Sequence, residues 1–223
     1  MKYKSVGIVL LAAIASACNT NNHPGSANQQ NKAEDTLHPD APLTANTRFA
    51  AGQVAESQGD LPRAAAQYKE AIKLDPKAPA PLLRLGMVYA NLKQYDDAVE
   101  VWNRYIKLTN GAAAGYSDLG LTQELAGRFK PAEEAYKTAL QKDPTNETAH
   151  VNYGLMLARL DRTPEAIAQL QTVLTPAEVH YNLASVLESQ DKIKEAKDEY
   201  QEALRLDPRM NDAKARLAAL DSD

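Results

Sequence analysis

The sequence predicts an all-α protein built as an α-solenoid, in which helical hairpins stack side by side. Two series of small residues carry this prediction, because each recurs at a step of 34 positions. They are Gly52, Gly86, Gly120 and Gly154, and Ala64, Ala98, Ala132 and Ala166. The pattern resumes at Ala184 and Ala196 after a step that is four residues shorter. A repeat of this length is typical of stacked hairpins that cover one another's apolar faces.

Residues 1–17 predict a secretory signal peptide. Lys2 and Lys4 precede a short apolar run, and a small-residue cleavage pattern follows at 15–17. The run is too short to span a bilayer. The next residue, Cys18, is the one cysteine of the chain.

The segment 14–18, Ile-Ala-Ser-Ala-Cys, resembles a bacterial lipobox, in which the cysteine sulfur is acylated and becomes the new N-terminus. It departs from that pattern at Ala15, where a larger aliphatic residue is usual. We expect lipidation at Cys18, with palmitate-type acyl chains anchoring the protein to a membrane. The alternative is ordinary cleavage that leaves a free thiol. Resemblance to enterobacterial lipoproteins with Asn19 after the cysteine implies the outer membrane.

The segment 18–43 predicts a lipidated cysteine followed by a flexible tether, because it is rich in Asn, Gln, Pro and small polar residues. The whole chain has a formal net charge of −4. Signal cleavage removes two lysines and makes it more acidic. A mildly acidic protein offers no electrostatic footprint for nucleic acid, so we expect no nucleic-acid partner.

Residues 44–223 predict the folded domain, made of five hairpins and a capping helix. Their bounds are 45–78, 79–112, 113–146, 147–176 and 177–210, with the cap at 211–220. The turns inside the hairpins are expected at Gly59-Asp60, Lys93-Gln94, Gly127-Arg128, Asp161-Arg162 and Asp191-Lys192. Gly tolerates the left-handed backbone of such turns, and Asp adopts it more readily than most residues.

Asp-Pro pairs are expected to end second helices at 75–76, 143–144 and 207–208. The reason is that a residue before proline disfavours the α-conformation.

These hairpins resemble the tetratricopeptide repeat (TPR). The eighth position of each unit is small, the twentieth is alanine, and the twenty-fourth is large: Tyr68, Trp102, Tyr136, Leu170 and Tyr200. The resemblance implies a right-handed α-solenoid of five helix-turn-helix TPR units plus the C-terminal capping helix. It also implies that the first helices of the units line a concave face that binds protein partners.

Two irregularities lead to further expectations. Bulky Tyr105 lies in the second unit where the pattern has a small residue, and Gly115 opens the third, so we expect a bulky-against-small exchange between them. The fourth unit is one helical turn short. Its second helix is expected to end near Leu174, and Thr175 is expected to begin a capping box with Glu178.

The sequence offers no candidate catalytic residues. It holds no nucleophile elbow, phosphate loop or zinc motif, and we expect no cofactor and no metal site. His150 and His180 share the fourth position of neighbouring units, which raises the possibility of a metal pair. We interpret them as structural, because two imidazoles without a carboxylate in register make a poor site.

The predicted partner-binding groove lies on the first helices of the second to fifth units. It combines an apolar strip with a polar rim: Leu83, Arg84, Met87, Asp118, Leu121, Val151, Asn152, Leu155, Arg159, Tyr181 and Asn182. A surface of this kind suits an amphipathic helix or an extended segment with apolar anchors. The alternative is that some of these side chains pack within the first helices instead. The Lys and Asn set with which chaperone-binding TPR proteins hold a terminal carboxylate is missing here.

Together these features predict a non-catalytic scaffold of the bacterial cell envelope that faces the periplasm and binds a protein segment. The layout resembles the outer-membrane lipoproteins of pilus and secretion machines, such as the Tad-type pilus lipoprotein and type IV pilotins. That resemblance implies a secretin or pilus component as partner. An adaptor for envelope enzymes, such as cell-wall hydrolases or proteases, is the alternative. An unrecognised enzyme would need a polar cluster in the groove, and the strip is mostly apolar.

Overall fold

The computed structural model describes residues 44–222, and this segment is all-helical. The predicted signal peptide, Cys18 and the tether lie outside the described residues. The helices are α1 (Ala45–Ser57), α2 (Leu61–Leu74), α3 (Pro79–Asn91), α4 (Tyr95–Leu108), α5 (Ala113–Leu125), α6 (Phe129–Lys142), α7 (Glu147–Arg159), α8 (Thr163–Leu170), α9 (Pro176–Ser189), α10 (Ile193–Leu206) and α11 (Asn211–Ser222). Within 44–222 none of them is long and apolar enough to cross a bilayer.

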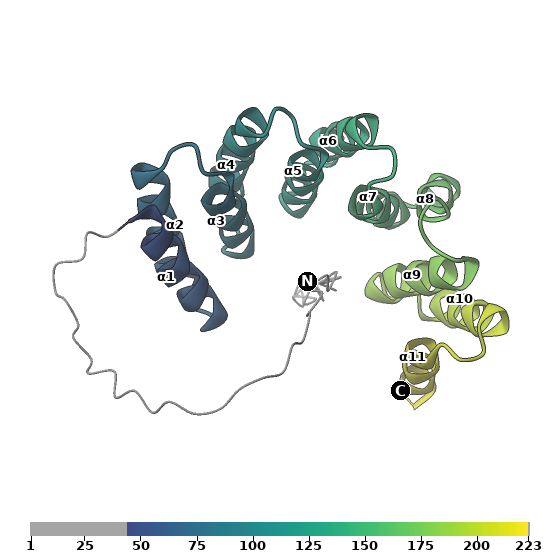
Figure 1. Cartoon of the computed structure of the whole chain (residues 1–223). Helices are drawn as coiled ribbons and strands as arrows, with labels where there is room; N and C mark the ends of the chain where they lie inside the picture. The colour runs from purple at the N-terminus through teal and green to yellow at the C-terminus, as the bar shows by residue number, and fades with distance from the viewer. Residues whose placement is uncertain (1–43, 223) are drawn as a thin grey trace, which may run out of the picture. The chain divides into compact units, whose positions relative to one another are not determined.

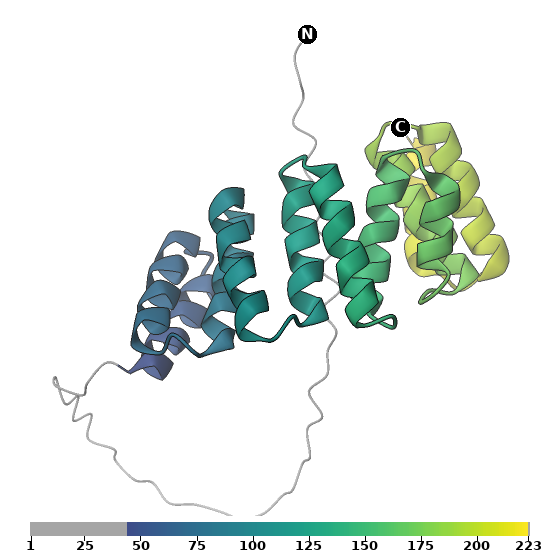
Figure 2. The same cartoon turned by 90° about the horizontal axis from the view of Figure 1, so that it is seen from above.

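Consecutive helices pack as hairpins, and the hairpins stack in a curved row (Figures 1 and 2). The pairs are α1–α2, α3–α4, α5–α6, α7–α8 and α9–α10, with α11 packed on α10. The odd-numbered helices α3, α5, α7 and α9 also contact one another in succession. Figure 1 shows them on the inner side of the row, with the even-numbered helices outside. The predicted α-solenoid is confirmed.

The predicted turns inside the hairpins are confirmed by their backbone. Gly59, Gly127, Lys93, Asp161 and Asp191 all have positive φ, between 58° and 76°. Lys93 shows that the hairpin turn imposes this conformation even on a residue that adopts it rarely. The second helices end as expected at extended residues before proline, namely Asp75, Asp143 and Asp207.

The core is built from the repeated contact between a small and a large residue. A Cβ placed on Gly52 would overlap the Tyr68 ring, and one on Gly120 would lie 2.7 Å from the Tyr136 ring. The same holds for Gly154, whose Cβ would meet Leu170 at 2.7 Å. The three large side chains and their two equivalents, Trp102 and Tyr200, are 1% exposed or less. Glycine therefore lets the two helices of a hairpin approach until the large side chain fills the space between them.

The expected exchange between the second and third units is confirmed. A Cβ on Gly115 would lie 2.8 Å from Ile106 Cγ1 and 2.9 Å from Tyr105 Cδ1, so the bulk of α4 occupies the space that α5 leaves. Trp102 adds a polar contact that was not predicted from the sequence. Its indole N–H donates to Thr122 Oγ1 at 2.9 Å, which joins α4 to α5 through a buried bond.

The fourth unit corrects one expectation. Helix α8 ends at Leu170, not near Leu174, and residues 171–174 form irregular turns. It has 8 residues, whereas the other second helices have 14. The capping box at Thr175 is confirmed. The backbone of Thr175 is extended (ψ 157°), so the preceding turns cannot continue as a helix into α9. In a shortened unit the connecting turns replace the end of the helix. The last helix also runs two residues past its expected end at residue 220.

Candidate partner-binding groove

The eleven predicted groove residues all lie on α3, α5, α7 and α9, the helices on the inner side of the row (Figure 1). Each of them is at least partly exposed. Met87 is 41% exposed, which is high for a large apolar side chain. The structure thus brings the predicted strip together on neighbouring helices.

Several side chains of the strip also belong to the interior. Leu121, Val151 and Leu155 are half-buried and pack against the core cluster that contains Tyr136 and Tyr153. Tyr181 packs in the same way against the cluster around Tyr200, with its ring centroid 5.6 Å away. The alternative that these side chains pack within the solenoid therefore holds in part. Each of them is also partly exposed, and the partner-binding role of that exposed surface stays a prediction.

A repeated bridge between neighbouring units borders this surface. In the first unit the Tyr68 hydroxyl donates to Glu56 Oε2 at 2.6 Å. Arg84, on the next first helix, pairs with the same carboxylate, with Nη2 2.7 Å from Glu56 Oε1. Each bridge thus joins a tyrosine of an outer helix, a glutamate near the end of an inner helix, and an arginine of the following inner helix.

The bridge recurs in the third and fifth units. Tyr136 donates to Glu124 Oε2 at 3.0 Å, and Arg159 Nη1 lies 2.5 Å from Glu124 Oε1. Tyr200 donates to Glu188 Oε2 at 2.8 Å, and Arg216 of α11 pairs with that carboxylate. This network was not predicted from the sequence. The signal was a glutamate twelve residues before the large tyrosine of the same unit.

Both arginines that were expected at the groove rim, Arg84 and Arg159, are ion-paired in these bridges. Glu124 is almost fully buried, and burial raises the pKa of its carboxyl even though Arg159 and Tyr136 act in the opposite direction. Burial and the hydrogen bond to Glu56 raise the pKa of the Tyr68 hydroxyl to about 12. Arg84 and Arg159 therefore serve the contact between units, and their charges are balanced within the solenoid.

Asp118 differs from these charged residues. It lies half-buried on α5, and burial raises the pKa of its carboxyl to about 7. Its charge contributes to the raised pKa of two tyrosines, Tyr105 on α4 and Tyr136 on α6. Within residues 44–222 its carboxylate has no hydrogen bond or ion pair. Among the predicted groove residues it is the charged group without a partner in the described chain.

Three of the remaining polar candidates, Asn182, His150 and His180, have local partners. Asn182 Nδ2 donates to the carbonyl of Glu178 in its own helix at 2.8 Å. His150 lies 3.0 Å from both Gln169 Oε1 and the Pro144 carbonyl, while His180 Nδ1 lies 2.6 Å from Glu199 Oε2. The two imidazoles thus have separate partners. The described residues hold no group of three or more potential metal ligands.

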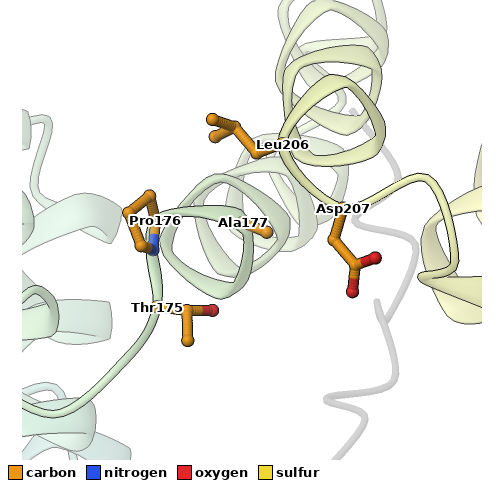
Figure 3. Close-up of a pocket in the computed structure, with 5 residues that line it drawn as sticks. All are labelled: Thr175, Pro176, Ala177, Leu206 and Asp207. Atoms are coloured by element: carbon orange, nitrogen blue, oxygen red, sulfur yellow. The ribbon is translucent and has the colours of Figure 1, made fainter.

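A cavity of about 300 Å³ lies outside the groove, where α9 begins and α10 ends (Figure 3). It is lined by Thr175, Pro176, Ala177, Leu206 and Asp207. Its polar groups already have partners, because Thr175 belongs to the capping box and Asp207 Oδ1 accepts from the Arg209 amide at 2.9 Å. This cavity has no feature that selects a ligand.

Comparison with known proteins agrees with this architecture. The chain is 31% identical over 98 residues to the small glutamine-rich tetratricopeptide repeat-containing protein 2 of Mycosarcoma maydis, a match that covers 44% of this chain and 28% of the relative. It is 30% identical over 149 residues to the heat shock protein STI1 of Saccharomyces cerevisiae, covering 63% of this chain and 25% of the relative. The chain thus spans about a third or less of the length of these relatives.

Solved structures show the same fold. YrrB, a TPR protein with an unusual peptide-binding site, aligns with a TM-score of 0.53 and 20% identity over 77% of this chain and 91% of its own. A thermophilic TPR protein of Thermus thermophilus aligns with a TM-score of 0.57 and 21% identity, over 79% of this chain and 98% of its own. The tetratricopeptide repeat models match residues 49–113, 118–180 and 177–210. With these matches and the small-against-large packing of its hairpins, the chain belongs to the tetratricopeptide repeat family.

Proposed function

We propose that this TPR scaffold is a non-catalytic adaptor of the bacterial cell envelope that holds a protein segment in the groove on α3, α5, α7 and α9. The observation that carries the proposal is the apolar strip itself. Leu83, Met87, Leu121 and Leu155 present partly exposed apolar surface on neighbouring helices, where a single segment can contact them together. In the envelope, such an adaptor would assist the assembly of a pilus or secretion complex.

The relatives support an interaction role more than a catalytic one. YrrB is described as having a peptide-binding site, and this chain shares its fold. Two other relatives are named as transferases, the protein O-mannosyl-transferase Tmtc1 of Drosophila melanogaster and SPINDLY of Hordeum vulgare. This chain matches only 14% and 11% of their lengths. The similarity to them gives no reason to transfer their activities.

The envelope assignment rests on the N-terminal sequence. The leader at 1–17 and Cys18 favour a lipid-anchored protein, and the segment up to residue 43 would separate the scaffold from the membrane. Replacement of Cys18 by alanine should move the protein from the membrane fraction to the soluble periplasmic fraction. If the Cys18→Ala variant stays in the membrane fraction, the anchor is not at this residue.

A site-specific crosslink tests the groove directly. A photocrosslinking amino acid replaces exposed Met87 in the full-length protein, and a second variant carries it at exposed Glu134 on α6, on the outer side of the row. After irradiation of cells, we expect a discrete protein adduct from position 87 and none of the same mass from position 134. Equal adducts from both positions, or none from position 87, would refute binding in the groove.

The identity of the crosslinked protein distinguishes the two envelope roles. A secretin or pilus subunit in the adduct, identified by mass spectrometry, supports assembly of a pilus or secretion complex. A cell-wall hydrolase or protease supports the alternative adaptor role. A cytoplasmic protein captured in intact cells contradicts the envelope assignment.

A further inference from the structure

The charges on the inner helices suggest what kind of segment the groove selects, an inference that rests on the proposed function. We propose that the groove binds a segment carrying a lysine or arginine flanked by apolar residues, and that Asp118 receives this cation. The occupant is thus a basic amphipathic segment of a protein partner.

The charge balance leaves one negative position open. Arg84 and Arg159 are paired with Glu56 and Glu124, so neither offers a free cation to an acidic partner. Asp118 has no such pairing within residues 44–222. The groove can therefore pair a positive charge of a partner with Asp118 on α5. Its two arginines are already paired and do not offer the same to a negative charge.

The burial of Asp118 makes a cation the expected complement. A carboxylate that is partly removed from water without a partner is unfavourable in its charged form, which is why burial raises the pKa of Asp118 to about 7. The titratable groups on which the charge of Asp118 acts are Tyr105 and Tyr136, and Tyr136 also belongs to the bridge of Glu124 and Arg159. A cation from outside would supply the missing partner and hold Asp118 in its ionised form.

The position of Asp118 sets what must flank that cation. Leu121 follows it by three residues on the same helix, so the two side chains are neighbours on one face. The same position of the neighbouring first helices holds Arg84 and Asn152, and Leu155 follows Asn152 by three residues as Leu121 follows Asp118. A segment that pairs with Asp118 therefore has apolar surface of α5 and α7 beside it.

A peptide selection tests both this inference and the groove. A displayed library of random twelve-residue peptides is selected against the immobilised full-length protein and against its Asp118→Asn, Met87→Asp and Glu134→Gln variants. Glu134→Gln removes one acid from the outer side and serves as the matched charge control. From the wild type and from Glu134→Gln we expect peptides with a lysine or arginine next to two or more apolar residues. From Asp118→Asn we expect apolar peptides without the basic preference.

The outcomes separate the two proposals. If no variant enriches any peptide, or if Met87→Asp enriches the same peptides as the wild type, binding in the groove fails and this inference fails with it. If wild type and Asp118→Asn enrich the same apolar peptides without a basic residue, the groove stands and the assignment to Asp118 is overturned. An acidic preference in the wild type overturns it as well.

Binding measurements on one selected peptide then quantify the contact. Replacing its basic residue by glutamine should weaken binding to the wild type about tenfold and leave binding to Asp118→Asn nearly unchanged. Because the proton must leave Asp118 before the cation pairs, wild-type affinity should also fall about tenfold from pH 8 to pH 6. Equal losses in both proteins, or an affinity that does not respond to pH, would show that the cation does not contact Asp118.

Discussion

The boundary between the third and fourth hairpins is joined more strongly than the boundary between the fourth and fifth. At the first boundary α7 packs against both α5 and α6. Glu124 and Arg159 bridge its inner side. On the outer side, Glu133 accepts from Tyr153 at 2.9 Å and pairs with Arg162 at 2.7 Å. Polar bridges and apolar packing act together there.

The second boundary follows the short helix α8. There α9 packs mainly on α7, because α8 ends before it reaches the length of the other outer helices. Gln190 donates to the Arg159 carbonyl at 2.9 Å, and Lys192 pairs with Asp161 at 2.5 Å in an exposed position. A small cavity of about 30 Å³ remains beside Leu183 and Val186. A second helix that is six residues shorter than its equivalents therefore weakens the contact between repeats without interrupting the row.

The largest expected effect comes from the core of the stronger boundary. Tyr136 is completely buried, stacks on Tyr153 at 5.8 Å and donates to Glu124, so Tyr136→Ala should lower the free energy of unfolding by about 3–5 kcal/mol. Leu183→Ala, at the weaker boundary, should cost about 2–3 kcal/mol because its surroundings are already less well filled. Urea denaturation of both variants measures the difference. A larger loss for Leu183→Ala would reverse the order of the two boundaries.

Local unfolding should also be easier beyond the weaker boundary than at the stronger one. Amide protection in α9–α11 is expected to be lower than in α5–α7 by about 1–2 kcal/mol, because fewer contacts hold the last hairpin to the row. Native-state hydrogen exchange, followed by mass spectrometry of peptides from these helices, gives the two values. Uniform protection across both segments would mean that the short α8 does not divide the solenoid.

The ion pair of Glu133 and Arg162 on the outer side of the stronger boundary should contribute less to the free energy of unfolding. Glu133→Gln is expected to cost about 1 kcal/mol at neutral pH, whereas Lys192→Gln at the exposed pair should change stability by less than about 0.5 kcal/mol. Hydrogen bonds from Arg162 and Lys137 lower the pKa of the Glu133 carboxyl to about 2. The folded pKa lies below the unfolded value, so this stabilisation is present above about pH 4.5 and is lost as the pH falls toward 2. Thermal melts from pH 7 to pH 2 check this, and a Glu133→Gln effect that persists at pH 2 would contradict it.

The effect expected at Asp118 has the opposite sign. The folded pKa of about 7 lies above the ordinary aspartate value of 3.8, so the folded protein holds this proton more tightly than the unfolded chain. Asp118 therefore destabilises the fold increasingly as the pH rises from about 4 to about 7. Asp118→Asn should raise the free energy of unfolding by up to about 1 kcal/mol at pH 8 and have little effect near pH 4. Destabilisation at pH 8 would show that the carboxylate has a stabilising partner.

The sequence predicted most of the fold because the deciding contacts repeat in register. Gly120 and Tyr136 recur at fixed positions, so their packing could be inferred without coordinates, and the exchange between Gly115 and Tyr105 was foreseen from volume alone. The end of α8 was predicted wrongly. Leu170, Val173 and Leu174 are apolar at helical spacing, and this pattern does not reveal that the shortened unit needs residues 171–174 for its turn.

For the groove, the sequence determined which residues share the inner face, since helical spacing and the repeat fix that. It did not determine their electrostatic state. Arg84, Arg159 and Asp118 look equivalent as rim charges in the sequence, yet two are paired and one has no such pairing within residues 44–222. That difference depends on contacts between side chains of neighbouring repeats, which only the tertiary stacking brings together: Tyr136 and Arg159 lie far apart along the chain and meet at Glu124 because α7 packs against α5 and α6.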